Sequence, residues 1–259
     1  MKPDYKNWMP RGMILSFAAA SVLSLAAAFT VRLLADGMLK TVLTVLLAVL
    51  AALFCGLTVW SIFMYRAFSY NGKRQMSRGI IEGVAAYVRL PEGGRGLDVG
   101  CGSGALAIAC AKRNPNAAFV GVDRWGKEYA SFSKLLCERN AIVEGVGNVS
   151  FARGDATKLD FPDESFDAVV SNYVYHNVPG DRQALLLETL RVLKKGGVFA
   201  IHDIFSKSKY GDMQAFVQKL KGMGYERVAL IDTTDGKFMS RGEAAWMGLS
   251  GSALLIGRK

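Results

Sequence analysis

Apolar residues dominate the first quarter of the chain, where two long segments carry no charged side chain. The first runs from Met13 to Val31 and the second from Thr41 to Met64. Each is long enough to cross a hydrocarbon core of about 30 Å as a helix. Only a short segment with a plausible turn at Asp36-Gly37 separates them, so the pattern predicts a transmembrane hairpin with helices over about 13–34 and 41–64.

Two other interpretations of these segments fit less well. A cleaved signal peptide would need a small-residue cleavage site followed by a polar mature sequence, and a second apolar segment follows instead. Two buried helices of a soluble bundle would each show a polar face, which these segments lack. We therefore divide the chain into an anchor over residues 1–70 and a second domain over residues 71–259.

Beyond residue 71 the apolar runs become short and alternate with amphipathic segments. The strands predicted from these runs are 96–99, 118–122, 149–152, 166–170, 198–202, 227–231 and 253–256. The predicted helices are 76–90, 104–113, 127–140, 182–193 and 213–222. This alternation is typical of an α/β fold with a mostly parallel sheet covered on both faces, and the last two strands can form a hairpin.

Composition and charge narrow the classes of function. Hydrophobic residues make up 51% of the chain and the formal net charge is +10. The content of apolar residues excludes disorder and collagen-like fibres. Four cysteines (Cys55, Cys101, Cys110 and Cys137) form no CxxC pair and only two histidines occur, so we expect neither a disulfide framework nor a bound metal.

The distribution of basic residues predicts a topology. Basic residues flank both apolar segments on the side away from the short connection, which places the N-terminus and the large C-terminal domain in the cytoplasm. The run from Arg66 to Arg78 contains no acidic residue. It suits anionic lipid headgroups at about 1 kcal/mol per basic residue, although a solvated run would look the same. A nucleic-acid partner is a weaker explanation, and Gly56 with its neighbouring alanines leaves self-association of the hairpin open.

A glycine-rich turn follows the first strand of the second domain. It reads Leu97-Asp98-Val99-Gly100-Cys101-Gly102-Ser103-Gly104 and leads into a helix. Glycines permit a sharp turn and a close approach of the backbone to a ligand. The same glycines satisfy the dinucleotide pattern GxGxxA, so the turn alone also allows a nicotinamide-dependent oxidoreductase.

Carboxylates at three successive strand ends distinguish the two interpretations. Asp98 lies before the glycines, Asp123 ends the second strand, and Asp155 follows the third. Together with Phe166–Asn172 and Leu190–Gly197, these motifs resemble those of class I S-adenosylmethionine-dependent methyltransferases of the small-molecule type, over roughly residues 76–259. The resemblance implies a Rossmann-like, doubly wound sheet of seven strands whose last strand is antiparallel.

The resemblance also assigns roles to residues that match the family's motifs. Asp98 and the turn with Gly100, Cys101, Gly102 and Gly104 would hold the methionine moiety of S-adenosylmethionine. Asp123 would bind the ribose, with Arg124 and Trp125 beside the adenosine, and Asp155 would accept from the adenine amino group beside Ala156. Asn172 would face the methyl group. Taken singly, Asp155 could instead cap a helix and Trp125 could serve packing.

Transfer of a methyl group needs a base only where the acceptor arrives protonated. The candidates follow the fourth and fifth strands, and His176 is preferred because an imidazole can accept a proton near neutral pH. A structural histidine that caps the next helix is the alternative. The other candidates are Tyr173, Tyr175, His202 and Asp203.

The acceptor itself is not encoded in a recognisable motif. Ser171-Asn172-Tyr173-Val174 departs from the Asn-Pro-Pro-aromatic motif of methyltransferases that act on amino groups of nucleic acid and protein. Together with the predicted anchor, this favours a small, lipophilic or membrane-associated acceptor. A cofactor-binding interaction module without catalysis remains the alternative from another class.

Overall fold

The computed structural model describes residues 2–126 and 131–259, which form two compact units. One unit contains residues 7–77. The other contains residues 78–259 together with residues 1–6, of which residue 1 is outside the described part. Residues 1–6 belong to the second unit although they precede the hairpin in sequence, because hydrogen bonds to Asn140 and Glu144 hold this segment.

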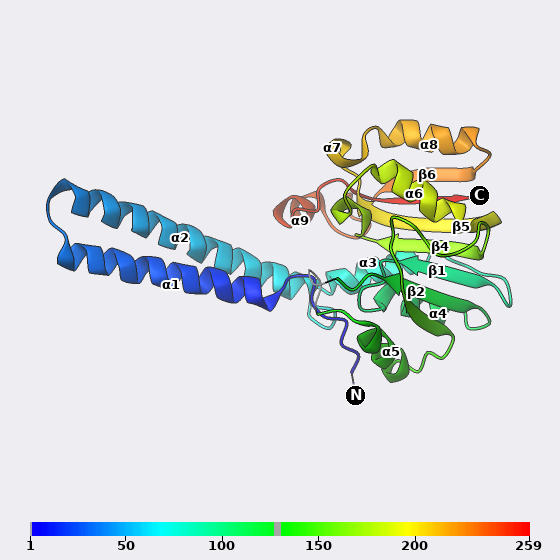
Figure 1. Ribbon diagram of the computed structural model, residues 1–259, viewed down its shortest axis with the longest axis horizontal. Coiled ribbons are helices and arrows are strands. Elements are labelled where there is room, and N and C mark those ends of the chain that lie inside the picture. Colours follow the sequence, from blue (N-terminus) through cyan, green and yellow to red (C-terminus); the bar gives the residue numbers. More distant parts are fainter. Residues whose placement is uncertain (1, 127–130) are drawn as a thin grey trace. The chain divides into compact units, whose positions relative to one another are not determined.

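The unit of residues 7–77 is a helical hairpin (Figure 1). Helix α1 spans Arg11–Leu34 and α2 spans Gly37–Phe68, so both are longer than the uncharged segments that predicted them. Ser21 Oγ donates to the carbonyl of Ala51 across the pair at 2.9 Å. The apolar windows of α1 and α2 have a mean hydropathy of 2.1 and 2.7, and only 11% and 6% of them are buried. Both helices are long and apolar enough to cross a membrane.

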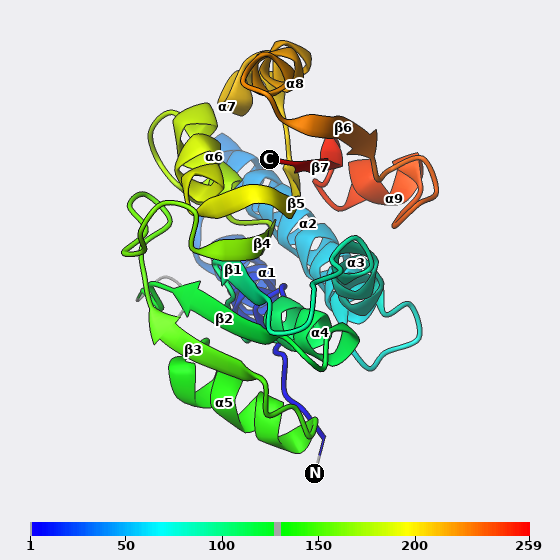
Figure 2. The ribbon, with the colours of Figure 1, turned by 90° about the vertical axis from the view of Figure 1, so that its right-hand side faces the viewer.

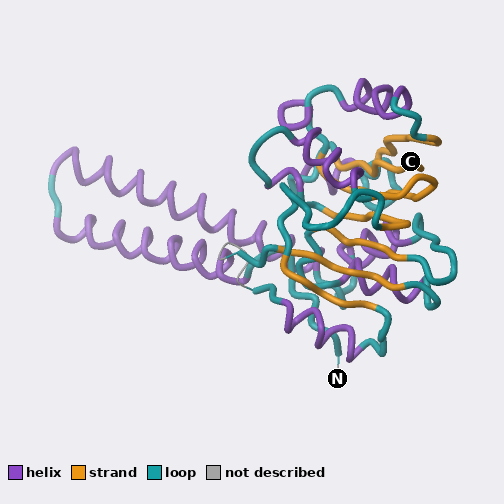
Figure 3. The backbone as a smooth tube through the Cα atoms, turned by 45° about the vertical axis from the view of Figure 1, so that its right-hand side comes forward, coloured by secondary structure: helices purple, strands orange, loops and turns teal. Residues whose placement is uncertain are grey.

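The second unit contains a seven-stranded sheet, in which the strands are orange in Figure 3. The strand order is β3-β2-β1-β4-β5-β7-β6, and β7 runs antiparallel to both of its neighbours. The strands are β1 (Arg95–Val99), β2 (Ala118–Asp123), β3 (Val149–Arg153), β4 (Phe166–Asn172), β5 (Leu193–Ile204), β6 (Glu226–Asp232) and β7 (Ser252–Arg258). The predicted α/β class, the seven strands and the terminal hairpin are confirmed.

Helices cover both faces of this sheet. Figure 2 shows α6 and α8 on one face and α3 and α4 on the other. The helices are α3 (Met76–Ala85), α4 (Ala105–Arg113), α5 (Lys134–Val143), α6 (Arg182–Arg191) and α8 (Met213–Gly222). The first four residues of the predicted helix 127–140 lie outside the described residues, and α5 begins at Lys134, where the side chain of Ser133 accepts from Leu136 N–H.

Three short helical elements were not predicted from the sequence, because each is too short to show a helical period. They are the 3-10 helix η2 (Tyr175–Asn177), α7 (Lys207–Tyr210) and α9 (Arg241–Trp246). Elements η2, α7 and α9 follow β4, β5 and β6, three mutually parallel strands. They therefore lie at the carboxyl edge of the sheet, where ligands bind in open α/β folds.

Candidate active site

The glycine turn after β1 adopts a backbone that favours glycine. Gly100, Gly102 and Gly104 have φ of +74°, +54° and +81°, and Gly104 is the N-cap of α4. A side chain on Gly100 would collide with Val174, which belongs to the loop after β4. The turn therefore brings the N-terminus of α4 close to the end of β4. The free N–H groups of a helix N-terminus attract negatively charged ligand groups.

Asp98 is a buried carboxylate beneath this turn. Its exposed fraction is 1%, and its Oδ2 accepts a hydrogen bond of 3.0 Å from Ala107 N–H in the first turn of α4. Burial raises the pKa of Asp98 to about 8, and the negative charge of Asp123 adds to the increase. A cation placed beside a buried carboxyl group lowers its pKa, so a cationic ligand group would ionise Asp98.

Asp123 at the end of β2 is tied to the glycine turn. Its Oδ2 accepts from Gly102 N–H at 2.9 Å and its Oδ1 accepts from Trp125 N–H at 2.7 Å. The indole Nε1–H of Trp125 donates in turn to the carbonyl of Gly102 at 2.9 Å, and Trp125 has a φ of +44°. The three residues thus form a closed ring of hydrogen bonds at the carboxyl edge of the sheet.

Asp155 after β3 is exposed and has local partners. Its Oδ1 accepts from the N–H and the hydroxyl of Thr157 at 2.8 and 2.7 Å. These bonds lower the pKa of Asp155, and the positive charge of Arg124 contributes to the decrease. Asp155 thus closes a local turn with Thr157 and is not the N-cap of a described helix, while its carboxylate stays accessible beside Ala156.

Asn172 at the end of β4 belongs to a buried chain of hydrogen bonds. Asn172 Oδ1 lies 2.8 Å from His202 Nδ1, and His202 Nε2 lies 2.9 Å from the hydroxyl of Thr233. Burial lowers the pKa of His202 to about 3. His202 is therefore neutral at physiological pH and connects the ends of β4, β5 and β6.

His176 pairs with Asp203 across the ends of β4 and β5. His176 Nδ1 lies 2.5 Å from Asp203 Oδ1, and Asp203 Oδ2 accepts from Tyr175 N–H at 2.8 Å. The side chain of His176 is 14% exposed and that of Asp203 is fully buried. An ionised carboxylate only accepts hydrogen bonds, so in the tautomer of His176 that donates to Asp203 the proton is on Nδ1 and Nε2 has a lone pair. A histidine held in this way can act as a base.

The two tyrosine candidates have different surroundings. Tyr173 has a φ of +55°, its hydroxyl lies 2.8 Å from Ser252 Oγ, and its ring centroid lies 4.7 Å from that of His202. Tyr175 is fully buried in the core, with its hydroxyl bonded to Thr189 at 2.5 Å. Burial raises the pKa of both phenols. Among the three predicted catalytic side chains, His176 combines partial exposure with a hydrogen bond to a carboxylate.

Sequence reasoning missed several residues that shape this edge. The ammonium of Lys209 in α7 donates to the carbonyl of His176 at 2.9 Å. The side chains of Cys137 and Asn140 in α5 donate to the carbonyls of Gly102 and Ser103. Their spacing of three places both on one face of the helix, but nothing in the sequence indicates which segment that face meets.

The described residues fit the groups of S-adenosylmethionine. Asp98 is a buried carboxylate whose raised pKa a cationic amino group would lower, and Asp123 offers two oxygens to the paired hydroxyls of a ribose. Among the described residues, no group of three or more His, Cys, Asp or Glu side chains could hold a metal ion.

Comparison with known proteins agrees with this geometry. Residues 97–201 match the family model described as "Methyltransferase domain". The chain is 30% identical over 177 residues to demethylmenaquinone methyltransferase of Geobacillus kaustophilus, which covers 64% of this chain and 73% of that protein. It is 32% identical over 128 residues to sterol 24-C-methyltransferase ERG6A of Gibberella zeae, with coverage of 49% and 32%.

A solved structure shares the fold. The structure of geranyl diphosphate methyltransferase covers 75% of this chain and 81% of its own, with a TM-score of 0.56 and 13% identity. The family match and the relatives exclude the nicotinamide-dependent alternative that the glycine turn left open and give S-adenosylmethionine as the cofactor. The seven-stranded sheet, the carboxylates at its edge and these similarities lead to one conclusion: the chain belongs to the class I S-adenosylmethionine-dependent methyltransferases.

Proposed function

We propose that this methyltransferase acts on a lipophilic acceptor dissolved in the bilayer to which its hairpin anchors it. The observation that carries the proposal is the combination of a methyltransferase domain with α1 and α2, of whose apolar windows only 11% and 6% are buried. The names of two relatives, a demethylmenaquinone methyltransferase and a sterol 24-C-methyltransferase, support acceptors of this class. An anchored enzyme meets such compounds at their high concentration within the membrane.

We call the second unit, residues 78–259 with residues 1–6, the catalytic unit. The proposed topology places the N-terminus and this unit in the cytoplasm. The supporting observation is the excess of basic residues beside the ends of the hairpin, in Lys2, Lys6, Arg11 and the run from Arg66 to Arg78. These side chains also suit anionic headgroups of the cytoplasmic leaflet. Cytoplasmic S-adenosylmethionine would then reach the site directly.

The cofactor supplies a methyl group on a positively charged sulfur, ready for in-line displacement. The protein contributes mainly by position, because fixing both reactants in a dry site removes much of the entropic cost of their encounter. Asp98 would hold the amino group of the cofactor, and Asp123 would hold its ribose. His176 Nε2 would take the proton of an acceptor hydroxyl, while Asp203 keeps the imidazole oriented and stabilises its protonated form.

Transfer of a labelled methyl group into lipid tests the proposal. Full-length protein in vesicles would receive labelled S-adenosylmethionine and either a reduced demethylated naphthoquinone with an isoprenoid tail, the same head group without the tail, or a sterol. We expect label in the tailed quinol or the sterol, and at least tenfold less in the tail-less compound. Asp123→Ala should abolish transfer. Equal rates with and without the tail would contradict a membrane acceptor.

A further inference from the structure

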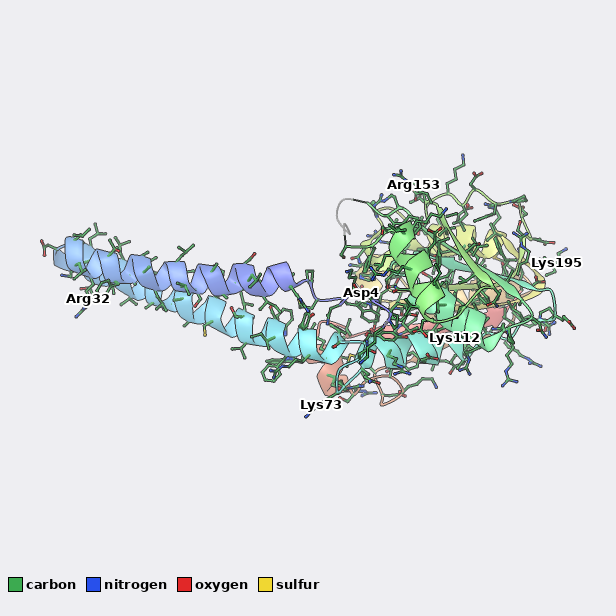
Figure 4. The ribbon with its side chains drawn as sticks, turned by 90° about the horizontal axis from the view of Figure 1, so that it is seen from below. Asp4, Arg32, Lys73, Lys112, Arg153 and Lys195 are labelled. Carbon is green, nitrogen blue, oxygen red and sulfur yellow. The ribbon has the colours of Figure 1, made fainter. Side chains whose placement is uncertain are left out.

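The first residues of the chain form a strap on the catalytic unit, which we define as residues Lys2–Lys6. Asp4 binds to Asn140 in α5 and Tyr5 binds to Glu144, the C-cap residue of α5, both more than 130 positions away in the chain. Tyr5 is 4% exposed, and its hydroxyl donates to Glu144 Oε1 at 3.1 Å. Glu144 also pairs with Lys112 of α4 (Asp4 and Lys112 are labelled in Figure 4). The strap is therefore bonded to the C-terminal part of α5, which Glu144 in turn connects to α4. We call the glycine turn Gly100–Gly104, which leads into α4, the cofactor turn.

Asn140 connects the strap to the cofactor turn. It is 1% exposed, its Oδ1 accepts from Asp4 N–H at 2.8 Å, and one Nδ2–H donates to the carbonyl of Asp4 at 3.0 Å. The other Nδ2–H donates to the carbonyl of Ser103 at 3.0 Å. The Asn140 amide thus uses its oxygen and one N–H to bind the strap, and it uses its other N–H to bind the turn.

A second residue of α5 supports the neighbouring peptide of the turn. Cys137, one helical turn before Asn140, donates its thiol hydrogen to the carbonyl of Gly102 at 3.2 Å. The two carbonyls belong to successive residues between Gly100 and Gly104, where all three glycines have positive φ. A backbone of this kind keeps its conformation only where its surroundings fix it. Helix α5 supplies that constraint.

We propose that the strap is a positioning element of the cofactor site, which acts through Asn140 on the carbonyl of Ser103. The proposal rests on the assignment of the turn Gly100–Gly104 to S-adenosylmethionine. Without the strap, Asn140 loses both of its bonds to Asp4, and its amide is free to rotate away from Ser103. The turn then samples other conformations, and the cofactor binds with lower affinity because it must select one of them.

The strap is continuous in sequence with the hairpin unit. Lys6 is the last residue of the strap, and Asn7, the first residue of the hairpin unit, donates its side-chain amide to the carbonyl of Tyr65 in α2 at 2.8 Å. Lys6 and Asn7 are consecutive residues of the chain. The affinity for the cofactor therefore depends on a segment that is continuous with the membrane anchor.

The test measures binding of S-adenosylhomocysteine to full-length protein in detergent by calorimetry. We expect removal of residues 2–6 to weaken binding about fivefold and Asn140→Ala about tenfold. Because both changes act on the same contact, the combined variant should be about tenfold weaker, not fiftyfold. In steady-state kinetics, the KM for S-adenosylmethionine should rise with kcat within twofold.

Asn114→Ala is the matched control for loss of stability. Asn114 is also a buried asparagine, and its amide donates to the carbonyls of Cys110 and Val88 at the far end of α4. It should lower the melting temperature as much as Asn140→Ala does, yet keep the affinity within twofold. Unchanged affinity without the strap, or effects that multiply in the combined variant, would overturn the proposal. Failure of the unmodified protein to bind S-adenosylhomocysteine would instead overturn the assignment of the turn, and with it this inference.

Discussion

The imidazole of His176 and the carboxylate of Asp203 are joined by a hydrogen bond of 2.5 Å between the ends of β4 and β5. The carboxylate is fully buried, and it is also fixed by backbone N–H groups of Tyr175 and Ile204. A buried carboxylate of this kind selects the tautomer of a histidine and orients its second nitrogen, as in hydrolytic triads. Asp203 therefore holds the imidazole of His176, the preferred candidate for the base, in a defined orientation.

Substitution of His176 tests this pair. We expect His176→Ala to lower kcat by about 10²- to 10⁴-fold for an acceptor that must lose a proton, the range typical of general bases. The affinity for S-adenosylhomocysteine should stay within twofold, because the role proposed for His176 is toward the acceptor. Asp203→Asn should also lower kcat, since an amide no longer stabilises the protonated imidazole. Undiminished turnover in His176→Ala would exclude the role of base.

The buried carboxylate of Asp98 makes the stability of the protein depend on pH. Its pKa is raised from 3.8 to about 8, so between these values the folded protein retains a proton that the unfolded chain has lost. The contribution of Asp98 to the free energy of unfolding therefore falls as pH rises through this range, by at most about 1.4 kcal/mol per pH unit. Above about pH 8 the loss is complete.

Asp98→Asn should remove this dependence. We expect the variant to gain in melting temperature relative to the unmodified protein as the pH is raised from 5 to 8, measured by thermal unfolding without cofactor. Taking the difference between the two proteins at each pH cancels the titration of every other group. A difference that stays constant across this range would show that Asp98 ionises as it does in the unfolded chain.

Binding of the cofactor should displace the proton of Asp98. The amino group of S-adenosylhomocysteine is cationic, and a cation beside a buried carboxylate lowers its pKa. We therefore expect release of up to one proton on binding at pH 7, and an affinity that rises between pH 6 and 8. Calorimetry in two buffers of different ionisation enthalpy measures the proton count. A count that is the same in Asp98→Asn would assign the release to another group.

The sequence predicted the sheet closely because its central strands are mostly buried on both faces. Strands such as Phe166–Asn172 appear as short apolar runs between turns, and these patterns are local. The glycine turn could also be predicted, because a positive φ requires particular residues. The acidic residues at the strand ends could be predicted as well, because ligands of open α/β folds bind at the carboxyl edge of the sheet.

The partners of the site residues could not be predicted in the same way. The bond between His176 and Asp203 depends on how two loops are placed, and its residues are 27 positions apart. The contact of Asp4 with Asn140 spans 136 positions, and it joins a polar segment before the anchor to a helix in the catalytic unit. The hydrophobic periodicity of a sequence shows which face of an element is buried, but it does not show which single polar side chains meet across the fold. The same applies to η2, α7 and α9, which are too short for a period.

Gly100 offers a test of how tightly the cofactor turn is packed against the loop after β4. A methyl group at this position would collide with the side chain of Val174, and φ is +74°. Gly145 is a matched control, because its φ is +67° and no described residue other than its chain neighbours has an atom within 4 Å of the position its methyl group would take. Both alanine variants bear the cost of a left-handed backbone, about 1–2 kcal/mol, but only Gly100→Ala also displaces Val174.

We therefore expect Gly100→Ala to lower the melting temperature more than Gly145→Ala and to weaken S-adenosylhomocysteine binding at least tenfold. Gly145→Ala should leave this affinity within twofold. Adding Val174→Ala to Gly100→Ala opens the space that the new methyl group needs, so it should restore part of the affinity, although the strain of the backbone remains. Equal affinity losses in both alanine variants, or no recovery with Val174→Ala, would mean that the contact with Val174 does not hold the turn in its binding conformation.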